Sequence, residues 1–195
     1  VARDFQYRDL SNMLLFFSNH DTPRLGDIFG QSYDKMKLSF AMLATMRGIP
    51  QMFYGDELMF SIDNQNRDDG RLRKDFPGGW EGDAMNLFDP SGRQAAASDP
   101  EWTGAADLHA YVKALLNWRK TKEVIHSGKT MHFIPQDNTY AYFRYNDTDL
   151  VFVFINNSDK EVKLTWSRFA EINAGLAEGR DVVTGKAVTL SDDTT

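Results

Sequence analysis

The chain has 195 residues, of which 42% are hydrophobic and 13% aromatic, and its formal net charge at pH 7 is −6. This composition is sufficient for a packed core and argues against extensive disorder. The acidic balance argues against a nucleic-acid partner, since nucleic acids bind basic surfaces. The sequence contains no cysteine, which excludes disulfides and thiolate metal sites, and no apolar run approaches the length of a membrane span.

The first part of the chain follows the order strand, loop, helix, strand that is typical of a parallel sheet. An apolar run at 14–17 predicts a strand over about 12–18 that is covered on both faces. A helix is expected over 32–47, with apolar residues on one face and Gly48 where it stops. A second short strand is expected at 51–54.

Polar residues follow the first predicted strand directly, at the place where a loop to a helix begins. Asn19, His20 and Asp21 stand there, and in an α/β barrel the carboxyl ends of the strands carry the chemistry. Asp21 offers a carboxylate, His20 offers a donor that titrates, and Arg24 offers a positive fork that can hold a carboxylate. The alternative is a simple turn, in which Asp21 or Thr22 caps a helix that starts at the following proline.

Two adjacent carboxylates, Asp56 and Glu57, follow the second predicted strand. Neighbouring residues of a strand point to opposite faces, so these two side chains are not expected to serve one site together. We expect them to position loops and to cap the next turn.

A long segment at 60–102 has little periodicity, and loops of this length are usually functional or disordered. Within it, Asp69 and Arg73 are four residues apart, so on one helical turn they share a face and can pair or grip one ligand. Two alternatives remain open: a register one step away, with Arg71 and Asp68, or a surface ion pair of little energetic value.

The second part of the chain begins with a helix expected over 103–122, which has a clear apolar stripe. From Gly128 the pattern changes to that of strands, and short apolar runs predict strands at 131–134, 140–145, 150–155, 162–166 and 181–190. Turns are expected at 146–149 and 156–159, and a hairpin at 184–185. His109, His126 and His132 show no metal-ligand spacing and are interpreted as structural or surface groups.

Several motifs together resemble the α-amylase family of glycoside hydrolases. The segment Phe-Ser-Asn-His-Asp at 17–21 resembles the fourth signature region, which follows the seventh barrel strand, and the segment at 48–57 resembles the eighth strand. Residues 75–80, with 86–88 and 92–93, resemble the neopullulanase and cyclomaltodextrinase branch. The resemblance implies an α/β fold: the last two βα units of a (β/α)8 TIM barrel over 1–127, and a C-terminal antiparallel β-sandwich over 128–195, which we expect to be truncated.

The resemblance also implies an activity, retaining hydrolysis of α-1,4 or α-1,6 glucosidic bonds in starch-derived glucans, pullulan or cyclodextrins. Asp21 is then the carboxylate that stabilises the transition state, and the residues implied to bind substrate are His20, Asn19, Arg24, Asp69 and Arg73. The nucleophile and general acid come from the fourth and fifth barrel strands, which this sequence lacks. We therefore expect the chain to be part of a longer protein, inactive alone, and to pair with the missing N-terminal barrel portion or to self-associate.

Three further points follow from the resemblance. Trp80 or Trp102 is a candidate to stack on a sugar ring, the alternative being that each plugs the loop onto the barrel. No cofactor is indicated, and calcium is implied only through upstream residues of the intact enzyme. Similarity to starch-utilisation enzymes favours a periplasmic or extracellular location.

The competing functions are a non-catalytic sugar-binding or scaffold protein, and a plain α-amylase or transglycosylase of the same family.

Overall fold

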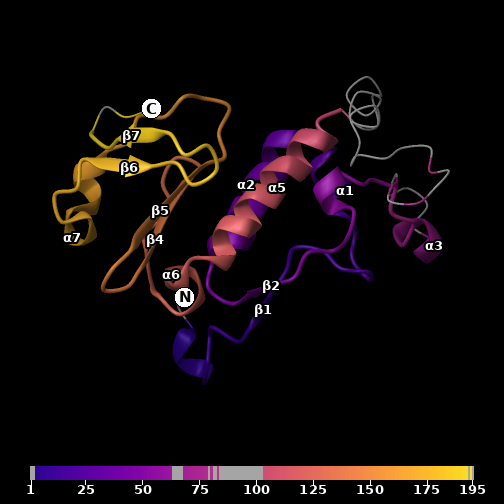
Figure 1. The fold of residues 1–195 in the computed structure, drawn as a ribbon, viewed down its shortest axis with the longest axis horizontal. Helices are drawn as coiled ribbons and strands as arrows, with labels where there is room; N and C mark the ends of the chain where they lie inside the picture. The colour runs from indigo at the N-terminus through magenta and orange to yellow at the C-terminus, as the bar shows by residue number, and fades with distance from the viewer. Residues whose placement is uncertain are drawn as a thin grey trace. The chain divides into compact units, whose positions relative to one another are not determined.

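The computed structural model describes residues 3–62, 68–78, 80, 83, 103–192 and 194 (Figure 1). The chain divides into two compact units, Val1–Gly128 and Lys129–Thr195, and each is described by itself. The motif residues at 86–88 and 92–93 and the side chain of Trp102 lie outside the described residues.

The first unit contains a parallel pair of very short strands. After a 3-10 turn, η1 (Asp4–Gln6), strand β1 (Leu14–Leu15) lies beside β2 (Ile49–Pro50), with Leu14 opposite Ile49. The chain between them forms α1 (Leu25–Phe29) and α2 (Tyr33–Thr45), so the predicted strand–helix–strand order is confirmed. Gly48 has a φ of 106°, and a Cβ there would be 2.7 Å from the Met13 carbonyl oxygen, so glycine permits the close approach that starts the ladder.

Both strands differ from their predicted extents. The first is two residues long rather than spanning 12–18, and the second precedes 51–54. Leu14 is 60% exposed and Phe16 44% exposed, so the prediction of a strand covered on both faces is wrong for this chain. Within the described residues β1 has β2 as its only strand partner, and a two-stranded ribbon cannot bury both of its faces.

Helix α2 packs against α5 (Ala105–Lys120), and the two lie side by side in Figure 1. The predicted helices at 32–47 and 103–122 are confirmed, with ends that differ by one to two residues. Their apolar stripes form one core whose buried members are Leu25, Met36, Phe40, Leu43, Met59, Leu108 and Val112. At the end of α5 the buried Arg119 donates to the carbonyls of Ala44 and Gly48, at 2.6 and 3.0 Å, before α6 (Glu123–His126).

The second unit is built on antiparallel strands, as predicted. β3 (Lys129–His132), β4 (Thr139–Tyr145) and β5 (Leu150–Asn156) form one sheet, and β6 (Glu178–Arg180) pairs with β7 (Ala187–Thr189). The asparagine turns are confirmed, because Asn146 Oδ1 accepts from the amides of Thr148 and Asp149, and Asn156 Oδ1 accepts from that of Ser158.

The strand predicted at 162–166 is wrong. Leu164 makes only an isolated bridge to Thr194, and the chain then forms a 3-10 helix, η4 (Trp166–Phe169), and α7 (Ala170–Asn173). Residues three apart share one side of a 3-10 helix, so both Trp166 and Phe169 reach the aromatic core. The strand predicted over 181–190 is also too long, since 181–186 forms the turn between β6 and β7 and only Ala187–Thr189 pairs.

Candidate functional site

The loop after β1 is shaped by Asn19. The Asn19 side-chain Oδ1 accepts a hydrogen bond from the backbone amide of Asp21 at 2.8 Å, and the backbone amide of Asn19 donates to Thr22 Oγ1 at 2.8 Å. These bonds form a side-chain turn that presents His20 and Asp21 on its outer edge. The alternative in which Asp21 or Thr22 caps a helix is wrong, because α1 has Arg24 at its N-cap and no side-chain cap.

A short helix, α3 (Asp69–Leu72), carries the second pair of predicted residues. Arg73 ends this helix, and its Nη2 lies 3.2 Å from Asp69 Oδ2, the predicted spacing of four. The alternative register is not the one formed: Asp68 caps α3 by accepting from the Gly70 amide, and Arg71 donates to the Ile62 carbonyl.

The two pairs meet at Arg73. Its Nη2 lies 3.3 Å from Asp21 Oδ1, and its Nε and Nη2 each lie 3.4 Å from the His20 carbonyl oxygen. His20 Nε2 is 3.2 Å from the other carboxylate oxygen of Asp21. We refer to His20, Asp21, Asp69 and Arg73 as the polar cluster.

The polar cluster is open to solvent, with side-chain exposures of 61% for His20, 67% for Asp21, 64% for Asp69 and 42% for Arg73. Exposed ion pairs add little to folding stability. Because its side chains are exposed, the polar cluster has donors and acceptors that can bind the hydroxyl groups of a ligand.

Arg24 does not lie with the polar cluster, which corrects the prediction that it contacts substrate. Its side chain is completely buried, with Nε and Nη2 at 2.9 and 2.7 Å from the Leu72 carbonyl oxygen, and Nη1 donates to the Tyr54 carbonyl. The fork does hold a carboxylate, as its chemistry suggested, since Nη1 lies 3.4 Å from Asp56 Oδ1. Because the Arg24 side chain has no exposed surface, it can act on a ligand only through the residues that it contacts.

The two carboxylates after β2 are buried in and beside a 3-10 turn, η2 (Asp56–Leu58). Asp56 accepts a short hydrogen bond from Ser18 Oγ, and Glu57 accepts from the Gly55 amide at 2.8 Å. These contacts hold the loop residues, as predicted, but the predicted capping does not occur, because η2 has Gly55 at its N-cap and no side-chain cap. Burial raises the pKa of Asp56 to about 6, although the Ser18 hydroxyl and Arg24 act in the opposite direction, and burial likewise raises the pKa of Glu57.

The raised pKa of Asp56 predicts a pH dependence of stability. Between about pH 4 and pH 6 the folded chain holds a proton on Asp56 that the unfolded chain has lost, so the free energy of unfolding falls as pH rises, by roughly 3 kcal/mol from this group. Asp56→Asn is expected to flatten that part of the curve in urea titrations from pH 4 to 7. Asp147→Asn, an exposed change in the β4–β5 turn, is the matched control. Parallel curves for wild type and Asp56→Asn would contradict the assignment.

Trp80 is 78% exposed, and its amide donates to Asp83 Oδ2. Among the described residues the face of its ring is open to stacking. The histidine interpretation is confirmed for two residues: His126 Nε2 bonds to the Arg119 carbonyl, and His132 packs edge-on against Tyr140.

Across the described part of the chain, no group of three or more His, Asp or Glu side chains gathers in a way that could hold a metal ion. In the same part of the chain, no helix combines the length and apolar character needed to cross a bilayer.

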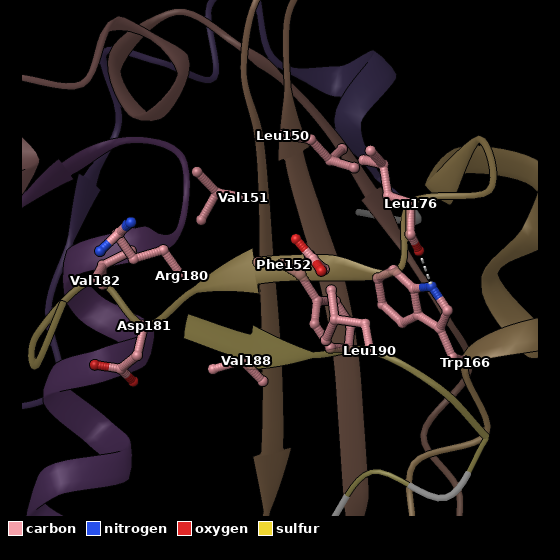
Figure 2. A pocket seen from close by; sticks show the side chains of 12 residues that line it. Leu150, Val151, Phe152, Trp166, Leu176, Arg180, Asp181, Val182, Val188 and Leu190 are labelled. Atoms are coloured by element: carbon pink, nitrogen blue, oxygen red, sulfur yellow. Dashed lines mark hydrogen bonds between the residues drawn. The ribbon is translucent and has the colours of Figure 1, made fainter. Parts of the chain in front are cut away.

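A separate pocket of about 260 Å³ lies in the second unit, between β5 and the β6–β7 hairpin. Figure 2 shows its wall of Phe152, Leu190 and Trp166, whose indole nitrogen donates to the Leu176 carbonyl at 2.6 Å. None of the predicted site residues lines this pocket, so it has no part in the site derived above.

Comparisons with known proteins show the family to which the chain belongs. The family described as "Alpha amylase, catalytic domain" matches residues 3–134, and "Cyclo-malto-dextrinase C-terminal domain" matches residues 130–195. A cyclomaltodextrinase of Geobacillus thermopakistaniensis is 26% identical over 75% of this chain and 21% of its own length. A 4-alpha-glucanotransferase of Thermotoga maritima is 30% identical over 75% of this chain and 35% of its own length.

Solved structures show the same fold. An Anoxybacillus α-amylase superposes with a TM-score of 0.65 at 22% identity, covering 98% of this chain and 37% of the amylase. The Geobacillus thermoleovorans α-amylase, solved with acarbose, gives a TM-score of 0.57 at 22% identity, covering 94% of this chain and 36% of its own. The chain thus spans about a fifth to two fifths of the length of these relatives. With two thirds of its residues matched by the catalytic-domain family and the rest by the cyclomaltodextrinase C-terminal family, the chain belongs to the α-amylase family and carries the end of its catalytic domain.

Proposed function

We propose that the protein that carries this chain hydrolyses α-glucosidic bonds in starch-derived glucans, pullulan or cyclodextrins with retention of configuration. The observation that carries the proposal is the polar cluster, in which a loop carboxylate, a histidine and an aspartate–arginine pair from a second segment are joined by contacts of 3.2–3.4 Å. The relatives named cyclomaltodextrinase and maltogenic α-amylase support this substrate class.

Retaining hydrolysis needs a nucleophilic carboxylate and a carboxylic acid about 5 Å apart across the bond. Both are expected from barrel strands outside this chain. Asp21 adds a third carboxyl group, whose negative charge binds the sugar more strongly as positive charge develops at the transition state. His20 donates to a neighbouring hydroxyl, and Asp69 and Arg73 hold the sugar ring in place through an acceptor and a charged donor.

Transfer of a glucan chain is the second candidate, because a relative at 30% identity is a 4-alpha-glucanotransferase. Hydrolysis and transfer use the same carboxylates and differ in whether water or a sugar hydroxyl attacks the intermediate. The polar cluster would have the same task in both.

The test uses the protein that carries this chain, supplied separately with β-cyclodextrin, pullulan and soluble starch. Release of reducing sugar is expected, and NMR of the first product is expected to show the α-anomer. Maltotriose separates the two reactions, since transfer produces longer oligosaccharides and hydrolysis does not. Absence of release and of transfer on every substrate would refute the proposal and favour a non-catalytic sugar-binding or scaffold protein.

A further inference from the structure

Three segments of the first unit meet at one buried guanidinium group. Arg24 begins α1, and its side chain contacts the carbonyl of Tyr54 after β2, the carboxylate of Asp56 in η2, and the carbonyl of Leu72 at the end of α3. Arg24 follows Asp21 by three residues. The same side chain thus connects the loop that presents the carboxylate with the helix that presents Asp69 and Arg73.

The contact with Leu72 has a specific geometric consequence. Two nitrogens of Arg24 share the Leu72 carbonyl oxygen, at 2.9 and 2.7 Å. That carbonyl belongs to the same peptide unit as the backbone nitrogen of Arg73. Two donors on one acceptor restrict both the position and the tilt of this peptide, and thereby the direction in which the Arg73 side chain leaves the backbone.

Helix α3 depends on such outside support. It has only four residues, and helices of this length do not hold themselves together in water. Leu72 is fully buried, and the Tyr54 hydroxyl adds a hydrogen bond to the Lys74 carbonyl at 3.0 Å. Arg24 is a charged and fully buried member of these supports, and it reaches α3 from the loop on which Asp21 lies.

The guanidinium is itself held firmly. Its central carbon lies 4.0 Å from the centre of the Phe53 ring and 5.1 Å from that of Phe60, and Asp56 is fixed on its other side by Ser18. Arginine stacks on aromatic faces and accepts few orientations when packed in this way. The rings and the carboxylate therefore favour the orientation in which the fork points at Leu72.

We propose that Arg24 is a positioning residue, which holds the Asp69–Arg73 pair against His20 and Asp21 and acts on the sugar through Arg73. The expected effect of Arg24 on the rate of the reaction rests on the proposed function, whereas its expected effect on the position of α3 does not. Arg24→Lys tests it, because an ammonium group keeps the charge but cannot bind one carbonyl with two nitrogens and reach two other segments. The matched control is Arg119→Lys, since Arg119 is a buried arginine that donates to two backbone carbonyls away from the polar cluster.

The first readout is amide hydrogen exchange of peptides that cover 68–74 and peptides from α5, in the protein that carries this chain. Arg24→Lys is expected to speed exchange at the Leu72 and Arg73 amides, which bond within α3, and to leave α5 unchanged. Arg119→Lys is expected to speed exchange in α5 and to leave exchange at 68–74 unchanged. Unchanged exchange at 68–74 in Arg24→Lys would overturn the proposal, whatever the protein's activity.

The second readout is a kinetic cycle with Arg24→Lys, Arg73→Lys and the double variant, with rates expressed per folded molecule. Arg24→Lys is expected to lower kcat by up to about a hundredfold, as displaced catalytic groups do, and to add little in the Arg73→Lys background. Arg119→Lys is expected to keep kcat. An equal loss in both backgrounds would mean that Arg24 affects the rate independently of Arg73 and would overturn the proposal.

If Arg24→Lys does not fold, Asp56→Asn replaces it as a milder change, which removes the charged partner of the fork and so weakens its hold on the Leu72 carbonyl. The same criteria apply to it, with a smaller loss of rate. An inactive wild-type protein would refute the proposed function, and hydrogen exchange would then decide the place of Arg24 by itself.

Discussion

Asp21→Asn is expected to lower kcat/KM on cyclodextrin or pullulan by at least about a hundredfold, the scale on which single groups that stabilise transition-state charge act. The amide has nearly the same shape, keeps an oxygen for His20 and Arg73, and loses only the negative charge. Asp21 is 67% exposed at its side chain, so the change leaves no buried group without a partner and should not alter folding.

The measurement compares kcat and KM of wild type and Asp21→Asn in the protein that carries this chain, together with their unfolding midpoints. Asp147→Asn makes the same chemical change at an exposed residue of the β4–β5 turn and is expected to behave as wild type. A loss confined mainly to kcat would place Asp21 at the transition state. Equal activity of Asp21→Asn and wild type would reduce the Asn19–His20–Asp21 segment to a turn.

Sequence patterns predicted best those features that depend on local spacing. The i, i+4 spacing of Asp69 and Arg73 predicted their ion pair, and the apolar stripes predicted α2 and α5 within two residues of their ends. The position of Asp21 after a strand predicted its place on an outward loop. Each of these follows from a period or a boundary that the sequence displays directly.

Features that depend on contacts between distant segments could not be predicted in this way. Nothing near Arg24 indicates that Leu72, 48 residues away, accepts its fork, so the residue was assigned to the ligand and not to the interior. The Ser18–Asp56 hydrogen bond spans 38 residues and was missed for the same reason. Trp166 was placed in the strand predicted at 162–166 because a short run of apolar residues suits a strand and a 3-10 turn equally, and tertiary packing decides between them.

The second unit has one aromatic core. Of the substitutions considered, Phe143→Ala is expected to lower the free energy of unfolding of this unit the most. Phe143 has no exposed surface, and its ring centre lies 4.7 Å from that of Phe152, 5.6 Å from that of Phe169 and 5.9 Å from that of Phe133. Removal of the ring gives up its burial, leaves a cavity among side chains that cannot all move inward, and breaks these ring contacts. Such substitutions cost about 3–5 kcal/mol.

Phe5→Ala is the matched control, because the same atoms are removed from a ring that is 85% exposed, and its cost is expected to stay within about 0.5 kcal/mol. Urea titration is followed by near-ultraviolet circular dichroism and tryptophan fluorescence. Trp166, 6.1 Å from Phe143 between ring centres, contributes the signal of the second unit, and the other three tryptophans belong to the first unit. A midpoint for Phe143→Ala as high as that of Phe5→Ala would mean that the core closes around the missing ring. In that case β4 and β5 would not depend for their stability on tight packing of the neighbouring rings, which are those of Phe133, Phe152, Trp166 and Phe169.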